Sequence, residues 1–300
     1  MAAFVTAAPP QPASAPMQLL RSHPMVGYFA ITFAGTWLLM LPIVLAQNGL
    51  GLLPFTLPDI LLAVLFVLGT FMGPTVAAFL VTAATSGRAG TRRLLQRYVQ
   101  WGVGARWYLV VLAGPIVMIV VGLSAWLGLA PLVALAQQWQ LIFNVYLAKA
   151  LALVLFPALA EEPGWRGVAL ARLQQRFGPV LGSSILGSLH ELWHLPIFFI
   201  AAFATGSLTI DLFVTFILEG IAATIFYTWI FNNTGGSLLI IILLHATLDA
   251  QIDYVHALLP AFTDDDGITL RIFGACALFL IIFTRGRLSY TRDACANGEG

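Results

Sequence analysis

Residues 156–196 read FPALAEEPGWRGVALARLQQRFGPVLGSSILGSLHELWHLP and place ionisable side chains inside an otherwise apolar sequence. Two adjacent glutamates, Glu161 and Glu162, are followed by Arg166, and two histidines lie near the end of the stretch. Ionisable groups at membrane depth are energetically unfavourable, so such a cluster indicates a functional site. We interpret the rest of the chain as the scaffold that holds this stretch.

The composition of the 300-residue chain is typical of a membrane protein. The chain is 60% hydrophobic and 9% charged, whereas roughly 25% of the residues of a soluble domain are charged. A formal net charge of +1 gives no reason to expect nucleic acid as a partner. No pattern of alternating short strands is present, so helices must satisfy the backbone in lipid. We therefore predict an all-α polytopic membrane protein.

Eight segments are apolar and long enough to cross a bilayer, which takes about 20 residues per helix. They are 27–46, 58–84, 107–127, 141–160, 179–203, 208–231, 237–257 and 270–284. If both termini are cytoplasmic, all of the 14 Lys and Arg residues except Lys149 and Arg271 fall on the cytoplasmic side, as the positive-inside rule requires. We predict about eight transmembrane helices that enclose an intramembrane polar cavity.

Three regions are expected along the chain. Residues 1–24 are rich in Ala and Pro and lack the features of a signal peptide, so they are expected to form a disordered cytoplasmic leader. Residues 25–287 are expected to form the integral membrane domain, and residues 288–300 a cytoplasmic tail.

The turn at Gly178 predicts which polar residues meet. Glu161 and Glu162 precede this turn and His194 follows it at a similar distance, so all three would lie roughly 23–25 Å from the turn if both arms are helical. His245 reaches the same level if the hairpin protrudes about 10 Å into the cytoplasm.

Two pairs with a spacing of four residues are expected to interact within single helices. Arg166 follows Glu162 at this spacing, so the two are expected to neutralise each other. Adjacent helical residues diverge by about 100°, which leaves Glu161 directed towards a cavity. Asp249 follows His245 at the same spacing, so its carboxylate can fix the imidazole tautomer. Such a unit could hold a developing oxyanion.

Pro163 is expected to kink or break the helix next to the glutamates, because proline lacks an N–H and crowds the preceding turn. Such a kink would admit water beside the carboxylates. The alternative interpretation of these polar residues is a buried network that fixes helix packing, or a path for protons or ions.

Residues 190–194, HELWH, also match the HExxH pattern of zinc proteases. In that interpretation His190 and His194 bind zinc and Glu191 is the general base. Zinc needs a third protein ligand, for which the candidates are Asp249, His245, Glu161 and Glu219. For Glu219, in an apolar segment, a packing hydrogen bond is the other explanation.

Three motifs, in this order along the chain, resemble those of the CPBP family, the intramembrane proteases that include CAAX prenyl endopeptidases and bacteriocin-processing proteins. The matches are EExxxR at Glu161, Glu162 and Arg166, FxxxH at His194, and HxxxN or HxxxD at His245 and Asp249. The segments that start at Gly73 and Gly87 look like the bacterial branch of this family. The chain departs from the usual pattern at position 190, where His190 replaces an aromatic residue, and at position 249, where Asn is more common.

The resemblance implies a multi-pass endopeptidase of the bacterial inner membrane that uses a glutamate and needs no cofactor. Its substrate would be a peptide or a membrane-anchored protein, either prenylated or carrying a leader. Glu161 would activate water and His194 would position that water, while His245 and Asp249 would stabilise the oxyanion. Glu162 and Arg166 would support this geometry. The alternatives are the zinc protease described above and a non-enzymatic membrane factor such as a bacteriocin-immunity protein.

Overall fold

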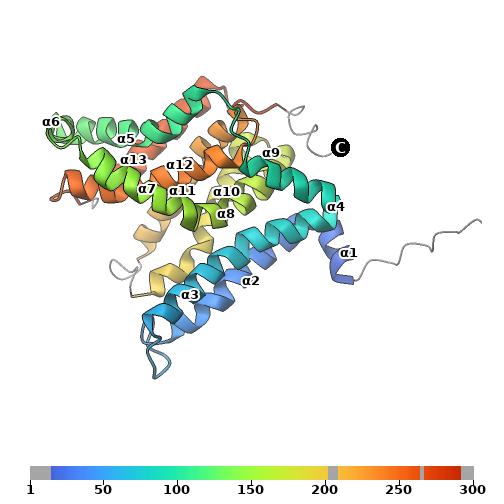
Figure 1. Cartoon of the computed structure of the whole chain (residues 1–300). Helices are drawn as coiled ribbons and strands as arrows, with labels where there is room; N and C mark the ends of the chain where they lie inside the picture. The colour runs from blue at the N-terminus through green and yellow to red at the C-terminus, as the bar shows by residue number, and fades with distance from the viewer. Residues whose placement is uncertain (1–14, 202–208, 264–266, 292–300) are drawn as a thin grey trace, which may run out of the picture.

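The computed structural model describes residues 15–201, 209–263 and 267–291, and in this part of the chain every regular element is a helix (Figure 1). The α-helices are α1 (Ala15–Ser22), α2 (Pro24–Leu45), α3 (Asp59–Thr70), α4 (Val76–Tyr98), α5 (Ala105–Leu127), α6 (Ala130–Gln137), α7 (Ala148–Leu153), α8 (Leu159–Gly164), α9 (Ala171–Phe177), α10 (Pro179–Trp193), α11 (Ile210–Asn233), α12 (Leu238–Leu258) and α13 (Ile268–Phe283). The prediction of an all-α polytopic membrane protein is confirmed.

Six continuous helical stretches of the described residues are long and apolar enough to cross a membrane. They are Pro24–Leu45, Asp59–Tyr98, Ala105–Leu127, Ile142–Phe177, Ile210–Asn233 and Leu238–Leu258. The predicted span 270–284 corresponds to α13, a shorter apolar helix of 16 residues. The predicted span 179–203 contains α10, which has only 15 residues, and part of this span lies outside the described residues. A total of eight spans therefore stays a prediction.

Helix α10 ends early because its C-terminal residues change conformation at His194. Residues Leu195–Phe199 continue as a 3₁₀ turn with Pro196 in its first positions. Proline has no N–H to continue an α-helical ladder. The early end places His194 at the junction of two elements instead of within a longer span.

One part of the predicted leader is folded. Residues Ala15–Ser22 form α1, and Arg21 in this helix donates a hydrogen bond from Nε to the carbonyl of Ala84 at 2.9 Å. The leader is therefore not disordered over residues 15–22, because this short helix packs beside α4. Residues 1–14 lie outside the described part of the chain.

Helix α12 is the centre of the bundle (Figure 1). Within its most apolar window, 72% of the residues are buried, compared with at most 33% for the other candidate spans. A helix that is apolar on all sides and buried needs neighbours all around it. Most residues of this window are therefore surrounded by protein, which makes α12 a rigid support for polar side chains.

The stretch Ile142–Phe177 alternates between α-helical and π-helical turns. The backbone is extended at Phe156 (φ −161°, ψ 130°), because a residue before proline disfavours the α conformation. The predicted break at Pro163 is therefore displaced: Pro163 lies inside α8, and a π-helical segment, Trp165–Leu170, follows it. Single π-helical turns within α-helices are frequent at functional sites.

Glycines allow the helices around this stretch to approach closely. A Cβ added to Gly164 would lie 2.5 Å from both the Pro74 carbonyl oxygen and the Tyr28 hydroxyl. A Cβ added to Gly187 of α10 would lie 2.7 Å from Cα of Ile221 on α11. Both approaches are shorter than a side chain permits, so these two crossings require glycine.

Candidate active site

The predicted site residues come from α8, α10 and α12 together with the segments that follow α8 and α10. Glu161 and Glu162 lie in α8, and the π-helical segment after it carries Arg166. His194 caps the C-terminal end of α10. His245 lies in the middle of α12, one turn before Asp249. The structure brings all of these residues together as two contacting groups, one around each glutamate.

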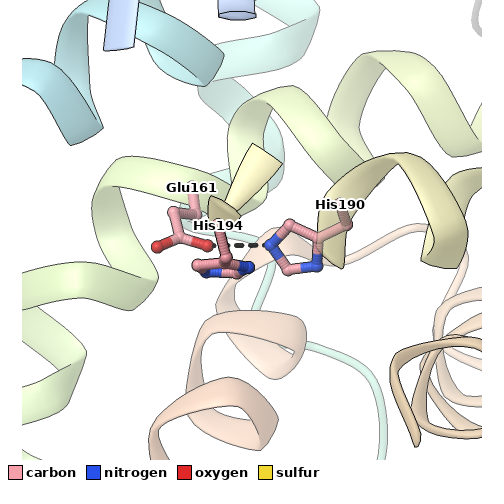
Figure 2. A group of neighbouring side chains, drawn as sticks. All are labelled: Glu161, His190 and His194. Carbon is pink, nitrogen blue, oxygen red and sulfur yellow. Dashed lines mark hydrogen bonds and ion pairs between the residues drawn. The ribbon is translucent and has the colours of Figure 1, made fainter. Parts of the chain in front are cut away.

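The first group consists of Glu161, His190 and His194 (Figure 2). Oε2 of Glu161 and Nε2 of His190 form a hydrogen bond of 3.0 Å. The His190 and His194 rings lie side by side with centroids 4.8 Å apart. One ligand-type atom from each of the three residues lies within 4.8 Å of the others. Glu161 and His190 are buried, at 3% and 7% exposure.

Aromatic rings and Glu191 hold the two histidines in place. The His190 ring lies 4.7 Å from the ring of Trp165, and His194 lies 4.8 Å from the ring of Trp193. Oε2 of Glu191 is 3.4 Å from Nδ1 of His194. Glu191 itself packs closely on Gly220 of α11, where a Cβ would strike its carboxylate. The orientation of His194 therefore depends on the contact between α10 and α11.

The second group is centred on the fully buried Glu162. Its Oε1 accepts a hydrogen bond from Nη1 of Arg166 at 2.8 Å, as the four-residue spacing predicts. The same oxygen lies 2.6 Å from Nδ1 of His245. The Arg166 guanidinium also covers the ring of Tyr227, with Cζ 3.9 Å from the ring centroid. Glu162 therefore joins α8, the π-helical segment and α12.

His245 lies between two carboxylates. Its Nδ1 faces Glu162, and its Nε2 lies 3.3 Å from Oδ2 of Asp249. Only the imidazolium form of histidine can donate at both ring nitrogens. This geometry therefore favours a positively charged His245. The contact with Asp249 was predicted from the sequence, and Glu162 is an additional, closer partner.

The residues of the two groups differ in exposure. The side chains of His194 and Asp249 are 22% and 42% exposed, whereas that of His245 is only 7% exposed. Glu162 is completely covered. His194 and Asp249 are therefore more accessible to solvent than His245, and Glu162 lies deepest.

Two contacts were not predicted from the sequence. The hydrogen bond between His190 and Glu161 joins α10 to α8, and the bond between Glu162 and His245 joins α8 to α12. Both depend on how the helices are rotated about their axes, for which the spacing of residues carries no signal. The HExxH pattern did draw attention to His190, but as a metal ligand.

A polar cavity of about 390 Å³ lies next to this region, on the side of Gly167 and Val168. The residues that line it do not include the six predicted site residues. This cavity therefore is not the polar cavity that was predicted to enclose the site residues.

Comparison with known proteins adds two findings. Residues 142–251 match the family model described as type II CAAX prenyl endopeptidase Rce1-like, and this range contains every predicted site residue. CAAX prenyl protease 2 of Methanococcus maripaludis is 24% identical over 144 residues, which cover 46% of this chain and 52% of that protein. The chain thus spans about half the length of this curated relative.

Proposed function

This chain belongs to the CPBP family through its Rce1-like domain, and from that premise we propose that it is an intramembrane endopeptidase. The observation that carries this proposal is that the two adjacent glutamates have different partners. Glu161 contacts the histidines of α10, whereas Glu162 is neutralised between Arg166 and His245. One carboxylate is therefore available for proton transfer while its neighbour serves as a fixed anion.

In the proposed reaction Glu161 is the general base. The hydrogen bond from His190 holds Oε2, so Oε1 is the oxygen we assign to the attacking water. Glu161 takes one proton from this water, and the resulting hydroxide bonds to the carbonyl carbon of the scissile peptide. The carbonyl π electrons move to its oxygen and form a tetrahedral oxyanion. His194, beside Glu161 and partly exposed, positions the water.

His245 is the group assigned to the oxyanion. Its Nε2 faces Asp249 at 3.3 Å, a longer contact than the 2.6 Å bond of Nδ1 to Glu162. A substrate carbonyl oxygen can therefore approach Nε2 beside the half-exposed Asp249, while Glu162 keeps the ring charged and oriented. A fixed positive charge at this position stabilises the developing negative charge. Collapse of the intermediate breaks the C–N bond, and the proton held by Glu161 passes to the leaving nitrogen.

The proposed substrate is a peptide segment of a membrane-associated protein. The relative's name refers to a CAAX prenyl protease, so a prenylated tail is one candidate and a leader peptide is another. The proposed location is the inner membrane of a bacterium, with both termini in the cytoplasm. The arginine distribution supports this orientation.

The first test measures cleavage of a fluorogenic peptide by the purified chain and by Glu161→Gln. This variant keeps the size of the side chain and removes its basicity, so we expect kcat to fall by at least about a hundredfold, in line with loss of a general base. Asp253→Asn is the matched control, because Asp253 forms a half-exposed ion pair with Lys149 on the same bundle. Full activity of Glu161→Gln would contradict the proposal.

A zinc-dependent protease is the second candidate, because Glu161, His190 and His194 form a possible ligand set. Ligand atoms around tetrahedral zinc lie about 3.4 Å apart at bond lengths near 2.1 Å, so the three residues would have to move closer than their present limit of 4.8 Å. Zinc content of the purified protein separates the two mechanisms. One zinc per chain, removable by a chelator with loss of activity, would support the zinc mechanism with Glu191 as base.

A further inference from the structure

Helix α11 contributes a residue to the second group that neither the sequence motifs nor the proposed reaction uses. Tyr227 lies in the C-terminal half of this helix and is only 5% exposed. Its ring contacts two of the residues that surround Glu162, namely Arg166 and His245. These contacts connect α11 to the buried charges of the candidate active site.

The contact with Arg166 uses the face of the tyrosine ring. Cζ of Arg166 lies 3.9 Å from the centroid of the Tyr227 ring, and the Arg166 side chain is 2% exposed. A guanidinium over an aromatic face is attracted by the ring quadrupole, and the attraction is strongest where both groups are removed from water. Nη1 of Arg166 bonds Glu162, whereas its Nε has no hydrogen-bond partner among the described residues. The ring face therefore supplies a second attachment for the guanidinium beside this one bond.

The contact with His245 brings the same ring to the other positively charged partner of Glu162. The centroids of the Tyr227 and His245 rings are 6.4 Å apart, and the interplanar angle is 85°. This geometry lies within the range of edge-to-face aromatic pairs. Tyr227 thus packs against both of the side chains that approach Oε1 of Glu162.

The shared oxygen of Glu162 makes additional support for its two partners necessary. Two cations that approach one oxygen repel each other, so other groups must keep them in place. Asp249 contacts His245 at Nε2, and the Tyr227 ring holds Arg166. If the guanidinium turned away, Glu162 would lose one of its partners and would orient Nδ1 of His245 less firmly.

We propose that Tyr227 is a positioning residue that acts on His245 through Arg166 and Glu162. Its ring face keeps the guanidinium on Glu162, and Glu162 keeps the His245 ring oriented, so that Nε2 lies where the oxyanion forms. The contribution comes from the ring, because both contacts are made by the ring. This inference rests on the proposed function, in which His245 is the group assigned to the oxyanion.

The test compares cleavage of the fluorogenic peptide by the purified full chain, by Tyr227→Leu and by Tyr227→Phe. We expect kcat to fall at least about tenfold in Tyr227→Leu, because small displacements of catalytic groups slow a reaction strongly. KM is expected to stay within about twofold, since the oxyanion is stabilised only in the transition state. Tyr227→Phe keeps an aromatic face for the guanidinium, so its kcat is expected to stay within about threefold of the unmodified chain.

Tyr254→Leu is the matched control, because it also removes a buried tyrosine ring. Tyr254 lies near the C-terminal end of α12 and packs on Tyr146. This variant is expected to lower the unfolding temperature, as Tyr227→Leu does, and to keep kcat. Equal loss of kcat in both leucine variants would overturn the positioning role and leave Tyr227 as a packing residue. If Tyr227→Leu does not fold, Tyr227→Met, which also lacks the ring, takes its place.

A double-variant cycle tests whether Tyr227 acts through Arg166. In an Arg166→Gln chain the guanidinium is already absent, so the addition of Tyr227→Leu is expected to change kcat by less than about twofold. If the two effects multiplied instead, Tyr227 would act independently of Arg166 and the proposal would be overturned. Where Arg166→Gln leaves no measurable kcat, Arg166→Lys, which lacks the planar group, serves as the background.

The remaining outcomes separate this inference from the proposed function. Loss of kcat in Tyr227→Phe equal to that in Tyr227→Leu would overturn the role of the ring face and assign the effect to the hydroxyl. Full kcat in Tyr227→Leu beside an inactive Glu161→Gln would overturn this inference alone. Full activity of Glu161→Gln, or no cleavage by the unmodified chain, would overturn the proposed function and this inference with it.

Discussion

His190 occupies the position at which the resemblance leads one to expect an aromatic residue, and here its ring both packs between tryptophans and bonds Glu161. Phenylalanine at this position would keep the packing and lose the bond. We expect His190→Phe to retain activity with kcat lowered about tenfold, because a hydrogen bond to a charged group contributes roughly 1.5 kcal/mol. His256→Phe, at an exposed position of α12, is the control for the exchange itself. A complete loss of activity together with loss of bound zinc would instead identify His190 as a metal ligand.

Glu162 should matter more for stability than its neighbour does. It is fully buried and faces two cationic side chains, Arg166 and His245. Glu162→Gln removes the carboxylate that contacts both of them, and loss of one partner from a buried ion pair typically costs about 3–5 kcal/mol. We therefore expect its thermal unfolding temperature in detergent to fall clearly below that of Glu161→Gln. Equal unfolding temperatures for the two variants would show that the second group is not an essential support.

At the scale of elements, the crossing of α10 and α11 controls where His190 and His194 lie. A Cβ at Gly187 would meet backbone atoms of Gly220 and Ile221, which cannot move aside as a side-chain tip can. Gly187→Ala should therefore separate the two helices, lower the unfolding temperature and reduce kcat. Gly274 in α13 has no atom within 4 Å of an added Cβ, so Gly274→Ala is the matched control.

The two glycine substitutions are expected to change the stability of the protein in different directions. Alanine is favoured over glycine in a helix by about 1 kcal/mol, so Gly274→Ala should leave stability unchanged or raise it. At Gly187 the collision outweighs this preference. If Gly187→Ala were as stable and active as Gly274→Ala, the close crossing would not be needed to place the histidines.

At the scale of the whole molecule, the sequence was informative wherever a property depends on local periodicity. The pairs Glu162–Arg166 and His245–Asp249 follow from the helical repeat alone, and the structure contains both contacts. The hydrogen bonds that join different helices do not follow from the helical repeat, because packing decides how each helix is rotated about its axis. The short helix α1 does not follow from it either, because its eight residues mix polar and apolar side chains without a long apolar run. Its order comes from contact with the bundle.

The orientation of the whole bundle in the membrane is the last prediction, and it rests on the distribution of arginines. With both termini cytoplasmic, the loop between α2 and α3 faces the outside and the basic part of α4 faces the cytoplasm. Leu52 in that loop and Arg88 on α4 are both exposed. In a chain whose native Cys276 and Cys295 are replaced by serine, Leu52→Cys should react with a membrane-impermeant maleimide in spheroplasts. Arg88→Cys should react only after the membrane is permeabilised. The reverse pattern would place both termini on the outer side and would contradict the proposed orientation.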